Sequence, residues 1–165
     1  MATHHDKITP EQQELIAESR LFFVASVHTA LEAGPEGQGS VNLSPKGNVP
    51  LEVIDPNCVA YLDYHGSGNE TARHLDSGGP VTLMVMSLHT EDAAIVRLYG
   101  HGRVEAVEDS PLAERLLANC RERKGLRQVV TIDVEHAQTS CGYGVPVFEY
   151  VADRESSQRG RRFKG

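Results

Sequence analysis

Short runs of β-branched and aromatic residues recur along this chain, and turns rich in Gly, Pro, Asn and Ser separate them. The strand-like runs are residues 21–27, 39–43, 51–54, 58–64, 81–88, 94–99, 102–107, 128–135 and 145–151, and the helix-like runs are residues 9–20, 68–75 and 112–123. The short spacing of these runs predicts a β-barrel or sandwich of about seven strands rather than alternating βαβ units.

Local signals define several of these elements. Thr9 is placed as an N-cap, with Pro10 at the first helical position and Gln12 positioned for a capping box. Residues 81–88 are nearly all apolar, which predicts a strand buried on both faces. Gly100 separates two strand-like runs and predicts a bulge or bend at a barrel corner.

Composition restricts the class of protein. A chain of 165 residues is expected to form one domain, here residues 1–152, followed by a polar, basic tail of residues 153–165 that we expect to be disordered. The net charge of −7 argues against nucleic-acid binding, because neutralisation of phosphates dominates that affinity. No apolar run is long enough to span a membrane, and residues 1–7 lack an apolar signal core, so a cytoplasmic location is expected.

The three cysteines are widely spaced, which favours neither a disulfide framework nor a zinc site. Cys141 is expected to be an inert thiol, with a reactive one as the alternative. The histidines show no metal-ligand spacing, and no metal site is predicted. His89 or His101 as an axial haem ligand is the one metal-type hypothesis that stays open.

Two polar turns are the strongest indication of a binding site. Each ends a strand-like run in small hydroxyl, amide and Gly residues, which leave backbone N–H groups open to an anion. The candidate ligands are Asn42, Ser44 and Lys46 in the first turn, and Ser67, Gly68, Asn69 and Thr71 in the second. Because a dianionic phosphate needs several donors and preferably a cation, the two turns together predict a cradle for a phosphorylated cofactor.

Six stretches follow one another between residues 21 and 107: Leu-Phe-Phe-Val-Ala-Ser, Val-Asn-Leu-Ser-Pro-Lys-Gly, Val-Ala-Tyr-Leu-Asp, Gly-Ser-Gly-Asn-Glu-Thr-Ala-Arg-His-Leu, Val-Thr-Leu-Met-Val-Met and Val-Arg-Leu-Tyr-Gly-His-Gly-Arg-Val. Their order resembles that of the pyridoxamine 5′-phosphate oxidase-like family, the FMN-binding split-barrel flavoproteins. The resemblance implies a mainly β (α+β) split barrel with short peripheral helices. It also implies FMN as cofactor, a homodimer with flavin at the subunit interface, and FMN-dependent oxidoreductase activity.

Two departures from that family change the expected substrate. Gly68 and Asn69 stand where pyridoxamine phosphate oxidases have the Arg-Lys pair that holds the FMN phosphate, and the basic C-terminal signature for pyridoxamine phosphate is not recognisable. We therefore expect an unknown substrate other than pyridoxamine phosphate. Flavin carries the electron chemistry, so no catalytic residue is named. The alternative is a non-catalytic split-barrel protein that holds flavin or haem for storage or sensing.

Each candidate ligand also has an ordinary structural interpretation. Lys46 either pairs with phosphate or the flavin ring, or is a solvated turn lysine. Asn42 and Ser44 share one strand face, where they contact flavin or solvent. Asp63 lies in an apolar strand and needs a partner, which is either flavin or one of two arginines, Arg97 and Arg103.

The remaining candidates also have two interpretations each. Ser67, Gly68 and Asn69 precede a short helix, where they either bind an anion or simply cap the helix. The Thr71 hydroxyl is a further expected phosphate donor. Arg97 lies inside a strand, and it either reaches a flavin or a subunit interface, or extends its guanidinium group to solvent.

Overall fold

An antiparallel sheet of eight strands forms the body of the protein in the computed structural model, which describes residues 2–30, 40–66 and 68–154. The elements are β1 (Thr3–His5), α1 (Pro10–Glu18), β2 (Phe22–Val27), β3 (Val41–Lys46), β4 (Glu52–Asp55), β5 (Cys58–Tyr64), α2 (Glu70–Asp76), β6 (Val81–Met86), β7 (Ala94–Ala106), a 3₁₀ turn (Val107–Asp109), α3 (Ala113–Ala118) and β8 (Leu126–Cys141). The strand order is β3-β2-β6-β7-β8-β5-β4, and β1 pairs with β8.

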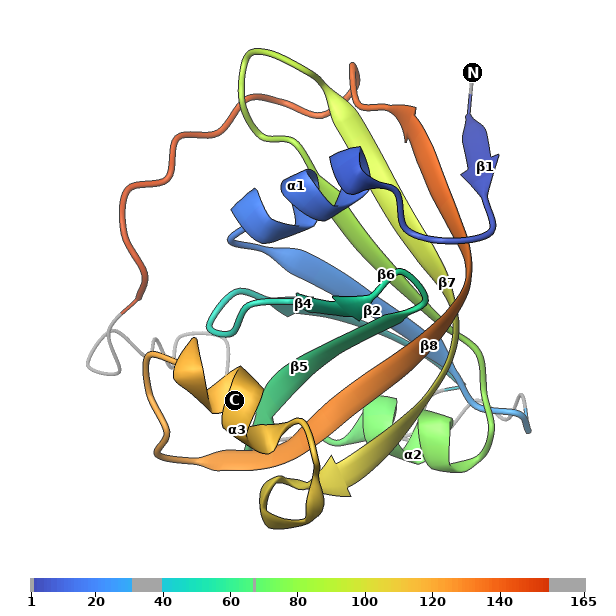
Figure 1. The fold of residues 1–165 in the computed structure, drawn as a ribbon, viewed down its shortest axis with the longest axis vertical. Helices are drawn as coiled ribbons and strands as arrows, with labels where there is room; N and C mark the ends of the chain where they lie inside the picture. Colours follow the sequence, from blue (N-terminus) through green and yellow to red (C-terminus); the bar gives the residue numbers. More distant parts are fainter. Residues whose placement is uncertain (1, 31–39, 67, 155–165) are drawn as a thin grey trace, which may run out of the picture.

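The sheet curls round on itself, as Figure 1 shows. The long strand β8 makes this possible, because it pairs with β5 in its first half, with β1 in its second half and with β7 along most of its length. Helix α1 covers one end of the barrel, and α2 and α3 lie at the opposite end (Figure 1). The arrangement confirms the predicted mainly β split barrel with short peripheral helices.

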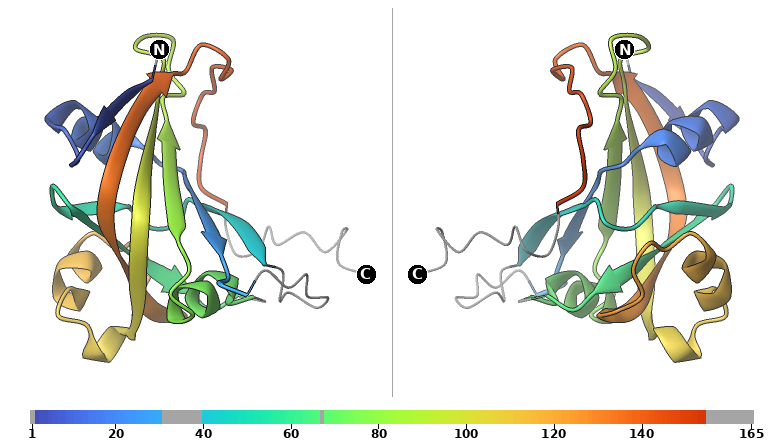
Figure 2. Two further views of the ribbon diagram at one scale, coloured as in Figure 1. Left: turned by 90° about the vertical axis from the view of Figure 1, so that its right-hand side faces the viewer. Right: turned by 90° about the vertical axis from the view of Figure 1, so that its left-hand side faces the viewer.

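The ends of the sheet are β3 and β4, so the barrel is open between them. Inside, the core residues alternate along the strands, with Val24, Leu83 and Leu98 almost fully buried. Figure 2 shows β3 and the carboxy-terminal segment, residues 142–154, standing out on the same side of the barrel. This open side is where the candidate site lies.

Gly100 marks the predicted bulge. Tyr99 lies opposite His136 on β8, but Gly100 lies opposite Val134, so the register shifts between them. A Cβ atom at Gly100 would lie 2.0 Å from the carbonyl oxygen of Asp133, which a real side chain cannot do. The bulge is confirmed, although β7 continues through it as one strand instead of two.

Several local predictions are confirmed. The Thr9 N–H donates to Gln12 Oε1 at 2.9 Å and the Gln12 N–H donates to Thr9 Oγ1 at 3.3 Å, which completes the expected capping box. Strand β5 has the predicted bounds, and α2 begins two residues later than expected. None of the helices in the described part of the chain has the length and apolar character needed to cross a lipid bilayer.

Other predictions were wrong. Residues 145–151 form no strand, and β8 instead extends to Cys141. Helix α3 ends at Ala118, short of the expected residue 123, because the N–H groups of Asn119 and Cys120 bond to carbonyls three residues back and close the last turn. In β6 buried and half-buried residues alternate, so one of its faces is partly open. The short strand β1 was not predicted, and the expected tail lies outside the described residues from residue 155 onward.

Replacing Gly100 with Ala is expected to lower the free energy of unfolding by about 1–3 kcal/mol, because the new methyl group must push β8 away at the bulge. Urea denaturation measures the change. Gly144→Ala is the matched control, since a Cβ atom there meets no atom within 4 Å. Equal stability of the two variants would show that the close approach at Gly100 does not constrain the sheet.

Candidate functional site

The edge strand β3 presents two chemically different faces. Asn42, Ser44 and Lys46 are half-buried and point toward the barrel opening, whereas Val41 and Leu43 are each 66% exposed on the other side. This confirms the prediction that Asn42 and Ser44 share one strand face, and Lys46 lies on the same face. In the described structure β3 pairs only with β2, so its other edge is open.

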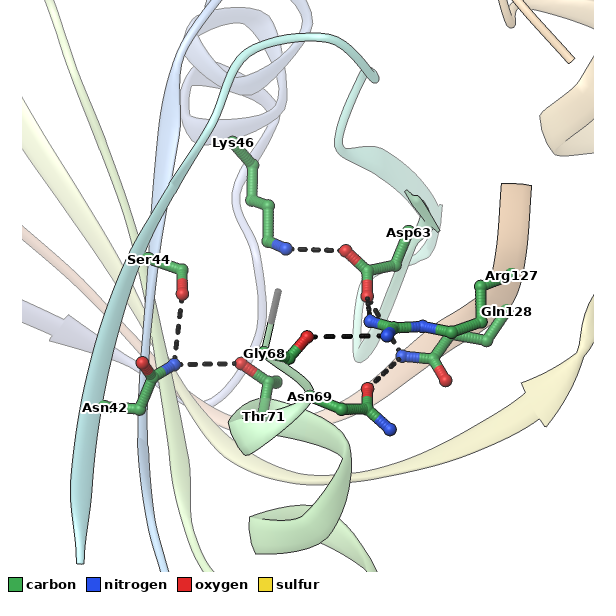
Figure 3. A network of polar contacts seen from close by, with 9 residues as sticks. All are labelled: Asn42, Ser44, Lys46, Asp63, Gly68, Asn69, Thr71, Arg127 and Gln128. Carbon is green, nitrogen blue, oxygen red and sulfur yellow. Dashed lines mark hydrogen bonds and ion pairs between the residues drawn. The ribbon is translucent and has the colours of Figure 1, made fainter. Parts of the chain in front are cut away.

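Asp63 of β5 is the centre of a polar network that crosses the barrel opening (Figure 3). Lys46 Nζ donates to Asp63 Oδ1 at 2.6 Å, and Arg127 Nη2 of β8 donates to Asp63 Oδ2 at 2.7 Å. Gln128 Nε2 adds a third hydrogen bond to Asp63 Oδ2 at 2.9 Å. One carboxylate thus holds two cations from different strands.

These partners correct the expectation that Asp63 pairs with Arg97 or Arg103. Arg97 Nη1 donates instead to Ser140 Oγ at 3.0 Å. Arg103 lies 3.4 Å from an Asp133 carboxylate oxygen on the exposed side of the sheet. The reason is the β5–β8 register, in which Asp63 lies opposite Gln128 and therefore next to Arg127.

The second turn joins the same network. Asn69 Oδ1 accepts a hydrogen bond from Gln128 Nε2 at 3.0 Å, and its side chain does not cap α2. The Gly68 carbonyl oxygen accepts from Arg127 Nη1 at 3.4 Å. Asn42 Nδ2 donates to Thr71 Oγ1 at 3.2 Å, which links the first turn to α2. The two predicted turns do come together, whereas Ser67 lies outside the described residues.

A cavity of about 90 Å³ opens between these elements. It is lined by Ser44, Lys46, Asp63, Tyr64, Gly66, Gly68, Asn69, Glu70, Thr71 and Arg127. The guanidinium Nε of Arg127 is buried and has no hydrogen-bond partner among the described residues. Two cations, two hydroxyl groups and an unused donor suit a phosphate group, so the residues present fit the phosphorylated end of FMN. Organic ligands usually occupy larger pockets, of about 300 Å³ or more.

The charges in the cavity nearly balance. Burial raises the pKa of Asp63, but the hydrogen bond and charge of Lys46 and the hydrogen bonds from Arg127 and Gln128 outweigh it, and the pKa is lower than usual. Asp63 is therefore a carboxylate at neutral pH. Glu70 also lines the cavity, and it opens α2, a helix of seven residues. The start of α2 thus favours an anion less than the sequence suggested.

Arg127 and Gln128 belong to this polar network, although the sequence did not indicate them. Arg127 follows a run of basic residues that resembles a solvated loop, and Gln128 is the first residue of a predicted strand. Their only signal was the need of Asp63 for a partner. Which cation would meet that need depended on the pairing of β5 with β8.

The other candidates lie elsewhere. Arg97 is not part of the cavity lining, and its role as a flavin ligand stays a prediction. His101 Nδ1 lies 2.8 Å from Glu135 Oε1, and both side chains are more than half exposed. His89 is exposed in the segment after β6. Within residues 2–30, 40–66 and 68–154, no three His, Cys, Asp or Glu residues are grouped so as to hold a metal ion.

Comparison with known proteins identifies relatives of this chain. Residues 8–141 match the family model described as pyridoxamine 5′-phosphate oxidase. A pyridoxamine 5′-phosphate oxidase family protein of Aspergillus flavus, ustO, is 30% identical over 161 residues. The match covers 96% of this chain but only 61% of the length of that relative.

Solved structures show the same fold at lower sequence identity. A HupZ variant from Group A Streptococcus superposes with a TM-score of 0.60 at 20% identity, covering 81% of this chain and 99% of that one. An FMN-binding protein from Syntrophomonas wolfei gives a TM-score of 0.57 at 15% identity, covering 83% and 85% of the two chains.

Asp63→Asn is expected to lower the free energy of unfolding by about 1–3 kcal/mol at neutral pH, because two partly buried cations lose their counter-charge. The folded-state pKa of Asp63 lies below the ordinary value of 3.8, so its stabilisation is present above that value. It is lost as the pH falls through the lowered pKa. Urea denaturation at a series of pH values should show the gap between variant and wild type closing as the pH falls below 3.8. A gap that is independent of pH would contradict this role.

Proposed function

The chain belongs to the pyridoxamine 5′-phosphate oxidase family, and on that basis we propose that it is an FMN-binding flavoprotein. The FMN phosphate is proposed to occupy the cavity between β3, β5 and α2. The observation that carries this proposal is the convergence of Lys46, Arg127 and the Ser44 and Thr71 hydroxyl groups on one small cavity. Charge-assisted donors of this kind are what a dianionic phosphate requires.

The small volume of the cavity supports a division of the ligand between two environments. A cavity of about 90 Å³ accommodates a phosphate group but not a three-ring flavin. The flavin ring is therefore proposed to lie outside the cavity, along the half-buried polar face of β3. Asn42 is the side chain proposed to face the ring there, and its Nδ2 is held by donating to Ser44 Oγ at 3.1 Å.

When bound, FMN supplies electron-transfer chemistry, and we propose that the protein is an oxidoreductase with a substrate other than pyridoxamine phosphate. The contribution of the chain is to fix the phosphate and to orient the ring. Tyr64 lines the cavity, but its hydroxyl group already donates to the Glu122 carbonyl oxygen. Burial, followed by the contact with Cys120, raises the pKa of Tyr64, so this hydroxyl remains protonated at neutral pH.

A second copy of the chain is proposed to complete the site. Val41 and Leu43 expose apolar side chains on the outer face of β3, directly behind the polar residues that face the cavity. The carboxy-terminal segment adds the exposed side chains of Tyr143, Val147, Phe148, Tyr150 and Val151. Apolar groups clustered on one side of a small barrel are typical of a protein interface. Twofold dimers are the commonest soluble oligomers.

Three free thiols in the described residues suit the reducing cytoplasm proposed as the location.

A non-catalytic flavin- or haem-binding role is the second candidate. It is favoured by Gly68 and Asn69, which supply no cation where an Arg-Lys pair stands in pyridoxamine phosphate oxidases. The colour of the purified protein separates the candidates: yellow indicates flavin, and red indicates haem. Mass spectrometry of the released ligand identifies it. A colourless protein that FMN does not restore would contradict the proposed function.

Lys46→Ala is expected to weaken FMN binding about ten- to a hundredfold, because one charge-assisted hydrogen bond is worth about 1.5–3 kcal/mol. Riboflavin, which lacks the phosphate, should bind wild type more weakly and respond little to the substitution. Fluorescence titration with both ligands makes the measurement. Lys7→Ala, which removes an exposed lysine near the amino terminus, is the control for net charge. Unchanged FMN affinity in Lys46→Ala would place the phosphate elsewhere.

The proposed dimer is expected to give twice the mass of 18.0 kDa in light scattering at micromolar concentration. Leu43→Asp should shift the protein toward the monomer, because it places a carboxylate in the middle of the apolar face of β3. Lys7→Asp at an exposed position serves as the control. A wild-type protein that remains a monomer would contradict the interface.

A further inference from the structure

The two cations of the cavity are already engaged by a carboxylate of the protein itself. Lys46 approaches Asp63 from β3, and Arg127 approaches it from β8, as Figure 3 shows. Each cation contacts a different oxygen of the same carboxylate, at 2.6 Å and 2.7 Å. Asp63 therefore occupies the position between the cations that a ligand anion would need to share.

The surroundings make these contacts strong. The exposed fractions are 10% for the Asp63 side chain, 20% for Lys46 and 18% for Arg127, so solvent screens the charges only partly. Glu70 is the second carboxylate in the cavity lining, and it contacts Arg73 at 3.4 Å. If a dianion entered while Lys46 and Arg127 stayed bound to Asp63, it would meet two carboxylates. Neither of these two cations would be free to bind it.

We propose that Asp63 is an exchangeable internal counter-ion, and that Lys46 and Arg127 release it when they bind the phosphate of a phosphomonoester. The inference rests on the proposed function of the cavity and adds two assignments to it. Arg127 becomes the second phosphate-binding cation, which supplies from β8 the charge that Gly68 and Asn69 lack. Asp63 becomes a residue that lowers affinity for the phosphate while it stabilises the empty site.

The geometry provides for both states of this exchange. Gln128 Nε2 donates to Asp63 Oδ2 at 2.9 Å, so the carboxylate retains a donor when the cations turn away. The buried Arg127 Nε has no hydrogen-bond partner in the described structure, which leaves the guanidinium group a donor for an incoming oxygen. Its contact with the Gly68 carbonyl oxygen, at 3.4 Å, is long and easily given up.

The exchange predicts opposite effects for two substitutions. Asp63→Asn keeps the size of the side chain and removes the competing charge, so FMN should bind about tenfold more tightly. Arg127→Gln removes a phosphate-binding cation, so FMN should bind at least about tenfold more weakly. Riboflavin affinity should stay the same within about twofold in both variants, because neither group is assigned to the flavin ring.

Asp133 and Arg103 supply matched controls. They form an exposed ion pair on the outer side of the sheet, at 3.4 Å. Asp133→Asn and Arg103→Gln make the same changes in net charge without touching the cavity. FMN and riboflavin titrations are run on all five proteins, with circular dichroism as the check of folding. Inorganic phosphate, titrated by calorimetry, serves as a probe that does not depend on the flavin ring.

Weaker or unchanged FMN binding in folded Asp63→Asn overturns the exchange, and so does an equal loss of FMN and riboflavin in Arg127→Gln. If Asp63→Asn does not fold, Arg127→Gln decides by the FMN–riboflavin comparison alone. A wild-type protein that binds phosphate but not FMN, with the predicted ranking of variants, removes the proposed function and supports the exchange. A wild-type protein that binds neither ligand overturns both.

Discussion

The ion pair between Lys46 and Asp63 joins parts of the barrel that the sheet itself leaves apart. Strand β3 is at one end of the strand order and β5 is next to the other end, so the ladder of backbone hydrogen bonds does not connect them. The ion pair spans this gap at 2.6 Å, and Arg127 of β8 binds the other oxygen of the Asp63 carboxylate. These three side chains line the polar cavity, and removing one partner of such a buried network leaves the others uncompensated.

Sequence patterns predicted the features that depend on near neighbours in the chain. The bounds of β5, the capping box of α1 and the two-sided character of β3 follow from periodicity and from contacts three residues apart. The bulge at Gly100 was also predictable from the sequence, because a glycine inside a strand usually marks a bulge or a close approach of another backbone segment. Such signals need no knowledge of the tertiary fold.

Features set by strand order were not predictable in the same way. Asp63 was recognised as a residue in need of a partner, yet Arg127 was not chosen, because only the register of β5 on β8 brings it close. The polar stretch of β8 before Cys141 gives no alternating apolar signal, and it forms a strand because β7 and β1 lie on either side. The apolar residues 145–151 satisfy strand propensity, but they form no ladder in the described structure.

The two-faced character of β3 limits how this strand can change in length. Successive side chains point to opposite sides, so inserting or deleting a single residue ahead of Asn42 exchanges the faces of everything that follows until the register recovers. Leu43 would then turn toward the cavity, and Lys46 would point away from Asp63. Length variation among relatives is therefore expected to fall in the loops that flank β3 and to spare its six residues.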